Sequence, residues 1–151
     1  MKTCVQILAK LGEHYHPKGT QRVDEQSFLK MRAKLKRWFA KRIPIYRGHP
    51  DDFPSSFYEG GLKSKEVGLV DDLILTEDAI LVVSKYTDDA YESVKSGQLL
   101  SPRWRMQPLG NNQFRPIELI SIGLTHNPNI RESGIPFKVW EIGGVNEQKA
   151  S

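Results

Sequence analysis

The sequence of 151 residues contains one cysteine, Cys4, and no long uninterrupted apolar segment. A single thiol excludes an internal disulfide and a cluster of thiolate metal ligands, so we expect a reducing compartment. No stretch approaches the ~20 consecutive apolar residues that a membrane span needs. Gln6 and Lys10 interrupt the short apolar segment near the N-terminus. We therefore expect neither a membrane partner nor a cleaved signal peptide.

The length fits one domain, and the positive charge is concentrated in one part of it. The formal net charge is +4. Basic residues crowd into one segment, and they are Lys30, Arg32, Lys34, Lys36, Arg37, Lys41 and Arg42. This segment is either a solvated helix face or a contact surface for nucleic acid or an acidic protein.

The apolar pattern predicts several short strands and two or three helices. A helix begins after Asp24, and its stripe of Phe28, Met31, Leu35 and Trp38 predicts about four turns. A second, short helix follows Thr87. Strands are expected at 5–9, 43–47, 99–106, 117–125 and 137–142, with a hairpin of 68–75 and 79–86, a long loop at 50–65 and a polar turn at 108–116. The fold class is therefore mainly β with two or three helices (α+β), built as a mostly antiparallel barrel or sandwich.

Two residues fit the chemistry of acyl transfer, which needs a hydroxyl nucleophile and an imidazole base. His49 stands where a predicted strand meets a loop rich in glycine and proline, a common place for reactive side chains. Ser101 precedes Pro102, which biases the serine toward an extended backbone. The chain lacks the Gly-x-Ser-x-Gly elbow of α/β-hydrolases. An ordinary turn is the competing interpretation of both positions.

A third group must orient the base, and several residues are candidates. Glu118 and His126 would lie on one face of a regular strand, at its two ends. Asp71 and Asp72 are further candidates, although acidic residues in mid-strand often mark edges or bulges.

A metal pair is the remaining chemical candidate. His14 and His16 flank Tyr15 and would share one side of an extended segment. No third ligand stands at a suitable spacing, so we expect no metal site. A metal-dependent hydrolase using these two histidines is a rival hypothesis.

Several blocks in order resemble one family, the head-maturation protease of Mu-like tailed phages. They are Val5-Gln6-Ile7-Leu8 with Gly12-Glu13, Ile43 to His49, Gly68 to Leu73, the strand and helix of Val82 to Lys95, Ser96 to Pro102 with its Ser-Pro pair, and Ile122 to Asn129. That family is similar to the broader prohead proteases and, more distantly in fold, to herpesvirus assemblins. Two positions depart from its pattern, since His126 stands where Asn is usual and Asn129 where Ala is usual.

The resemblance implies a serine endopeptidase with a small antiparallel β-barrel. Ser101 would be the nucleophile, His49 the general base, and His126 or Glu118 the orienting residue, with no metal or other cofactor. Residues 1–142 would form the protease domain and 143–151 a flexible tail.

The implied substrates are the phage scaffold protein, the enzyme itself and, as a further candidate, the major capsid protein. The place of action would be the host cytoplasm, inside the procapsid, with incidental DNA contact and a homo-oligomer as open questions. The alternative is a non-catalytic capsid-assembly or DNA-associated protein that uses the basic helix as its contact surface.

Overall fold

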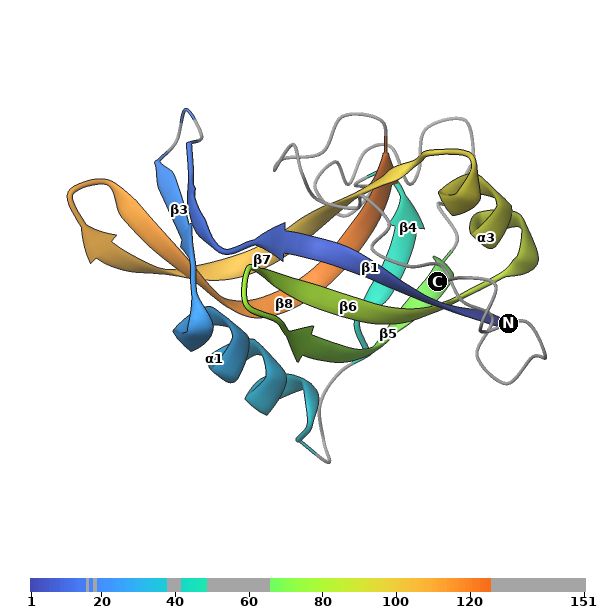
Figure 1. Ribbon diagram of the computed structural model, residues 1–151, viewed down its shortest axis with the longest axis horizontal. Coiled ribbons are helices and arrows are strands. Elements are labelled where there is room, and N and C mark those ends of the chain that lie inside the picture. The colour runs from blue at the N-terminus through green and yellow to red at the C-terminus, as the bar shows by residue number, and fades with distance from the viewer. Residues whose placement is uncertain (16, 18, 38–41, 49–65, 126–151) are drawn as a thin grey trace, which may run out of the picture.

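A computed structural model describes residues 1–15, 17, 19–37, 42–48 and 66–125 (Figure 1). This part of the chain forms one eight-stranded sheet, curled into a half-barrel, and two helices. The elements are β1 (Lys2–Lys10), β2 (Gly12–His14), β3 (Thr20–Val23), α1 (Glu25–Leu35), β4 (Pro44–Arg47), β5 (Glu66–Leu75), β6 (Ala79–Tyr86), α3 (Asp88–Lys95), β7 (Leu99–Gly110) and β8 (Gln113–Thr125). The predicted mainly-β class with helices is confirmed.

Strand β8 pairs with three other strands, β3, β4 and β7. The strand order is β1-β6-β5-β4-β8-β3-β2, and β7 pairs with β8 outside this path. The C-terminal half of β8 lies parallel to β4, and the N-terminal end of β8 lies parallel to β3. The other strand pairs are antiparallel. The sheet is therefore mixed but mostly antiparallel, and the two parallel pairs of β8 were not predicted.

The main hydrophobic core fills the inside of the curl. Its contributors from the strands include Leu8, Ile45, Leu73, Ile80, Leu100, Ile122 and Leu124. Helix α1 adds Met31, and α3 adds Ala90, Tyr91 and Val94. The two helices lie toward opposite ends of the curled sheet (Figure 1). Neither described helix has the length and apolar composition needed to cross a membrane.

Helix α1 begins at the predicted cap but ends early. The Asp24 carboxylate accepts a hydrogen bond from the Ser27 amide, and the Asp24 amide donates in return to the Ser27 hydroxyl oxygen. The helix has 11 residues, so the prediction of four turns was wrong. It closes because the Arg37 amide bonds to the Lys34 carbonyl at 3.4 Å, a tighter pattern than the α-helical one. Trp38 lies outside the described residues.

The hairpin of β7 and β8 is longer than the sequence pattern predicts. Its strands pair from Leu99 opposite Thr125 to Gly110 opposite Gln113. The connection is only Asn111-Asn112, with φ of 53° and 59°. These left-handed angles fit a type I′ turn, whose twist matches that of the flanking strands. The turn predicted around Gly110-Asn111-Asn112 is therefore confirmed, but its predicted bounds of 108–116 were too wide.

The other predicted elements within the described part are confirmed. The hairpin of β5 and β6 forms as expected. Thr87 caps α3 by accepting a hydrogen bond from the Ala90 amide at 3.3 Å. After α3, Gly97 takes a φ of 110°, which only glycine adopts easily. The loop at 50–65, the strand at 137–142 and the tail at 143–151 lie outside the described residues.

Candidate active site

Ser101 lies near the start of β7, where that strand pairs with the C-terminal half of β8. Its direct cross-strand partner is Gly123. The neighbouring pair, Leu100 and Leu124, points into the main core. Because successive side chains of a strand point to opposite faces, Ser101 points to the outer face of the curled sheet. Its side chain is nevertheless 0% exposed.

The end of β4 reaches the same part of β8 from the other side. Tyr46 is the partner of Gly123 in the parallel β4–β8 pair. One step further, the Gly48 amide donates to the Leu124 carbonyl at 2.8 Å. Adjacent strands lie ~4.8 Å apart, so the backbones of Tyr46 and Ser101 are separated by roughly 10 Å across β8.

A row of paired residues thus crosses four strands, with an irregularity in the β4–β5 register between Ile45 and Tyr46. Glu66 of β5 is the partner of Tyr46. The row therefore runs from the Glu66 carboxylate through Tyr46 and Gly123 to Ser101. Glu66 forms an ion pair with Arg42. Gly123 contributes no side chain, so the tyrosine and the serine flank a position occupied by backbone alone. Sequence reasoning missed Glu66 and Tyr46, because only the register of β4 shows that they share a row with Ser101.

His49 and His126 lie outside the described residues, but their chain neighbours are described. Gly48, which precedes His49, is hydrogen-bonded to Leu124. Thr125, which precedes His126, is the partner of Leu99 on β7. Both neighbours therefore lie at the same end of β8 as Ser101.

Glu118 is not brought to this end of the sheet. It is the partner of Arg105, four residues along β7 from Ser101, which corresponds to roughly 13 Å. Its carboxylate accepts a hydrogen bond from Arg105 at 2.8 Å and lies 4.0 Å from the Lys34 ammonium. Its place beside α1 separates it from the strand end that leads to His49.

A β-bulge explains why Glu118 does not point to the face that was predicted for it from a regular alternation of side chains. Arg103 pairs with Ser121 and the next residue, Trp104, pairs with Leu119, so Ile120 has no partner on β7. Ile120 is 38% exposed. The extra residue reverses the alternation, and Glu118 and Leu124 point to opposite faces.

Asp71 and Asp72 of β5 are engaged by cations from other elements. Asp72 forms ion pairs with Arg32 at 3.2 Å and with Lys36 at 3.4 Å. Partial burial raises the pKa of Asp72, but hydrogen bonds from the Leu73 amide and Arg32 and the charge of Lys36 outweigh it, leaving the pKa below its ordinary value. Asp71 pairs with Lys85 at 3.7 Å, beside an irregularity in β5. Both carboxylates therefore serve surface ion pairs.

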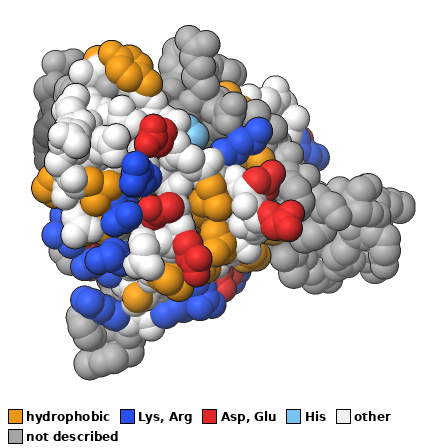
Figure 2. Space-filling view, turned by 60° about the vertical axis from the view of Figure 1, so that its left-hand side comes forward, with side chains coloured by type: hydrophobic (Ala, Val, Ile, Leu, Met, Phe, Trp, Pro, Cys, Tyr) orange, Lys and Arg blue, Asp and Glu red, His pale blue; other side chains and the backbone are white. Residues whose placement is uncertain are grey.

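The cations of helix α1 are largely engaged with these same carboxylates. Arg32 and Lys36 share Asp72, and Lys34 shares Glu118 with Arg105. Figure 2 shows acidic side chains interspersed among the basic ones on the face that it presents. The structure thus joins the basic helix to the sheet through ion pairs.

Only His14 of the candidate metal pair lies within the described part of the chain. The His14 ring Nε2 lies 2.6 Å from the Lys10 carbonyl oxygen. His16 lies outside the described residues. Among the residues that the structure describes, no three His, Cys, Asp or Glu side chains gather as metal ligands. Cys4 is buried in the core.

Arg47 connects the strand ends around Ser101 and was not singled out from the sequence. Its guanidinium Nη1 donates to the Ser93 hydroxyl at 3.0 Å and to the Gln98 side-chain oxygen at 3.4 Å. A charged residue at the end of an apolar strand was the only signal in the sequence.

Comparisons of the chain with protein-family models, with curated proteins and with solved structures found no match.

Proposed function

We propose that this chain is a serine endopeptidase of the prohead-protease type, with Ser101 as nucleophile and His49 as general base. One observation carries the proposal: Tyr46, Gly123 and Ser101 form one row across β4, β8 and β7. The row joins the strand that bears the serine to the strand that leads to the histidine. Gly48, which precedes His49 in the sequence, is hydrogen-bonded to Leu124 of β8.

The proposed reaction follows the usual steps of acyl transfer. Neutral His49 accepts the proton of the Ser101 hydroxyl as the oxygen attacks a peptide carbonyl. The imidazolium then protonates the leaving amine, and water hydrolyses the acyl-enzyme with His49 again acting as base. Backbone N–H groups stabilise the oxyanion, each contributing about 3–4 kcal/mol.

His126 is the better candidate for the residue that orients His49. Its neighbour Thr125 pairs with Leu99, two residues before Ser101. Glu118, in contrast, is engaged by Arg105 and Lys34 farther along the sheet. An imidazole at position 126 would accept the His49 ring N–H and hold the productive tautomer.

The burial of Ser101 has a consequence for this mechanism. A hydroxyl with 0% exposure must become accessible before it can attack a substrate carbonyl.

The proposal includes the family's barrel, substrates and setting. The curled sheet with a helix toward each end is compatible with a small barrel of the prohead-protease and assemblin type (Figure 1). The scaffold protein and the enzyme itself are the proposed substrates, and the major capsid protein is a further candidate. Cleavage would take place inside the procapsid, in the host cytoplasm.

The alternative, a non-catalytic protein that binds DNA or another partner through its basic helix, receives less support. Arg32, Lys34 and Lys36 already form ion pairs with Asp72 and Glu118. Such pairs reduce the positive charge available to an anionic partner. Salt-sensitive binding to random DNA that disappears when Lys34, Lys36 and Arg37 are neutralised would favour this alternative.

The deciding experiment combines cleavage of the scaffold protein encoded beside this chain with labelling by a fluorophosphonate, which reacts with activated serines. We expect the wild type to cleave and to be labelled, and Ser101→Ala and His49→Ala to do neither. Ser84→Ala is the matched control, because Ser84 is also a buried strand serine but lies on β6. Equal activity of Ser101→Ala, or no activity of the wild type with its scaffold, would overturn the proposal.

A further inference from the structure

Arg47 is the last residue of β4, and its side chain reaches two other segments. The guanidinium Nη1 donates to Ser93 Oγ of α3 at 3.0 Å. It also lies 3.4 Å from Oε1 of Gln98, in the link between α3 and β7. One side chain therefore joins β4 to residues far along the chain.

The segment that Arg47 contacts is itself well ordered by hydrogen bonds. The Gln98 amide bonds to the Ser93 carbonyl at 3.1 Å, and the Gly97 amide bonds to the Val94 carbonyl at 3.1 Å. The Ser93 hydroxyl also donates to the Asp89 carbonyl at 3.2 Å. Arg47 thus binds two side chains that project from a hydrogen-bonded turn.

This turn leads directly into the strand that carries the proposed nucleophile. Gln98 is followed by Leu99, the first residue of β7, and Ser101 is the third residue of that strand. On the other side, Arg47 is followed by Gly48, whose amide bonds to Leu124 of β8. The Arg47 side chain therefore spans the two strand ends that flank β8.

We propose that Arg47 is a positioning residue, which fixes the end of β4 relative to the start of β7. The inference rests on the proposed function, since these ends lead to His49 and carry Ser101. A guanidinium has several donors in a rigid plane and can bind Ser93 and Gln98 together. Both hydrogen bonds come from Nη1, whose N–H groups have fixed directions in the guanidinium plane. A lysine ammonium also has several donors, but its flexible stem holds the partners less firmly.

A small displacement is enough to affect the rate. Misplacing reacting groups by about 1 Å can lower a rate on the order of a hundredfold. The contacts of Arg47 lie at the surface, so their loss should disturb folding little. The inference therefore predicts a variant that is folded but catalytically slow.

The test measures kcat and KM for scaffold cleavage, the rate of fluorophosphonate labelling and its pH profile, and the melting temperature. We expect Arg47→Ala to lower kcat and the labelling rate about tenfold to a hundredfold, with KM and the melting temperature little changed. Gln98→Ala should have a smaller effect of the same kind. Combining it with Arg47→Ala should add little, because both remove the same contact.

Arg47→Lys separates position from charge. It keeps the positive charge near the strand end, so full recovery of the wild-type rate and pH profile would overturn the positioning role and indicate a charge effect. Recovery that stays several-fold short of the wild type supports the inference. Arg22→Ala is the matched control. Like Arg47, Arg22 is a strand arginine at the surface, but its guanidinium pairs with Glu13 at 3.0 Å.

The failures of the two proposals are distinguishable. If the wild type shows neither cleavage nor labelling, the proposed function fails, and the positioning role fails with it. If the wild type is active and Arg47→Ala is equally fast, only the positioning role is overturned. A parallel fall in activity and melting temperature would also overturn it, because the side chain would then act through stability.

Discussion

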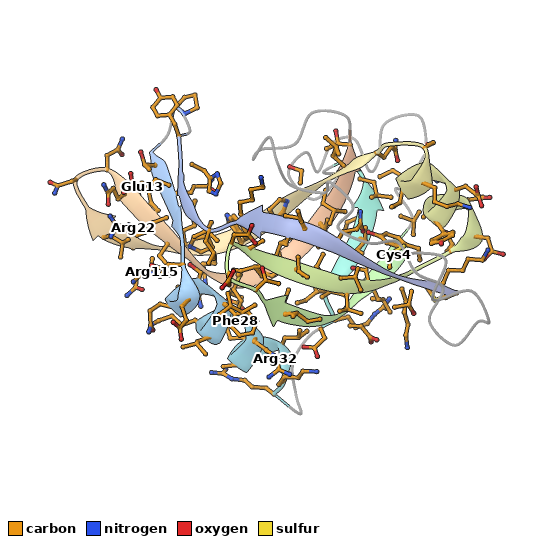
Figure 3. The ribbon with its side chains drawn as sticks, in the orientation of Figure 1. Cys4, Glu13, Arg22, Phe28, Arg32 and Arg115 are labelled. Carbon is orange, nitrogen blue, oxygen red and sulfur yellow. The ribbon has the colours of Figure 1, made fainter. Side chains whose placement is uncertain are left out.

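Arg115 on β8 binds Asp24, the cap of α1, although 91 residues separate them. Its Nε lies 3.1 Å from each carboxylate oxygen, and Nη2 lies 2.9 Å from Oδ2. Figure 3 shows Arg115 beside the start of the helix. The same carboxylate accepts a hydrogen bond from the Ser27 amide. The Asp24 side chain therefore caps α1 and also attaches the helix to the long hairpin of β7 and β8.

Two substitutions of Asp24 should separate the contribution of its helix cap to stability from that of its charge. Asp24→Asn keeps an oxygen that can cap the helix but loses the charge, whereas Asp24→Ala loses both. We expect Asp24→Ala to lower the free energy of unfolding by about 1–2 kcal/mol and Asp24→Asn by less. Denaturant unfolding of the two variants measures the difference. Equal losses would show that the cap contributes nothing beyond the ion pair.

The contribution of Asp24 should also depend on pH. Partial burial raises the pKa of Asp24, but hydrogen bonds from Arg115 and Ser27 outweigh it, so the pKa lies below its ordinary value of 3.8. A carboxyl with a lowered pKa stabilises the folded state fully above that ordinary value and loses this contribution as pH falls through the folded pKa. The stability gap between wild type and Asp24→Asn should therefore narrow in acid. A gap that is constant from neutral pH to below 3.8 would contradict the lowered pKa.

Tyr86 and Gln6 form a buried hydrogen bond whose two partners should not contribute independently. The Tyr86 hydroxyl donates to Gln6 Oε1 at 2.6 Å, and both side chains are 0% exposed. Burial, followed by the nearby Cys4 thiol, raises the pKa of Tyr86, so the hydroxyl stays protonated. Tyr86→Phe leaves the Gln6 oxygen without its donor and should cost about 1–3 kcal/mol.

Adding Gln6→Met to Tyr86→Phe should recover most of that loss. Gln6 Nε2 finds no hydrogen-bond partner among the described residues, so removing the whole amide also removes an unpaired group. Replacing both partners by apolar groups of similar shape is often nearly neutral. The measurement is a double-mutant cycle from denaturant unfolding. Additive losses would show that the hydrogen bond is not what couples the two residues.

Two substitutions in the turn at Asn111-Asn112 should change the free energy of unfolding in opposite directions. Both residues have positive φ, at 53° and 59°. Asn112→Gly relieves this strain and should raise the free energy of unfolding by a few tenths of a kcal/mol. Asn112→Val should lower it by about 1–2 kcal/mol, because left-handed backbone is costly for a β-branched residue. Thermal unfolding checks the signs, and two changes of the same sign would argue against the turn type.

Gly123 should be intolerant of a side chain if Ser101 is the nucleophile. Directly opposite residues in an antiparallel pair have Cβ atoms ~5 Å apart, so Gly123→Val places methyl groups beside the Ser101 hydroxyl. We expect fluorophosphonate labelling to slow about tenfold or more. Ile117→Val, elsewhere on β8, is the control, and melting temperatures report folding. Labelling of folded Gly123→Val at the wild-type rate would show that the reactive serine is not beside this position.

Local patterns predicted most elements but failed where strands had to match each other. The cap at Asp24, the cap at Thr87 and the hairpin of β5 and β6 depend on groups within a few residues, and the structure confirms them. The predicted shared face of Glu118 and His126 assumed a regular strand. The bulge at Ile120 reverses the alternation, and nothing in the local sequence indicates it.

By itself, the amino-acid sequence determined the mainly-β class, the beginnings of both helices and the extended backbone at Ser101. These follow from preferences and hydrogen bonds that act over one or two turns of chain. Only the tertiary structure decided that Tyr46, Gly123 and Ser101 share a row, that β4 runs parallel to β8, and that Arg47 reaches α3. The register between distant strands is chosen by which side chains the whole core can bury together, and that choice is not a property of any one segment.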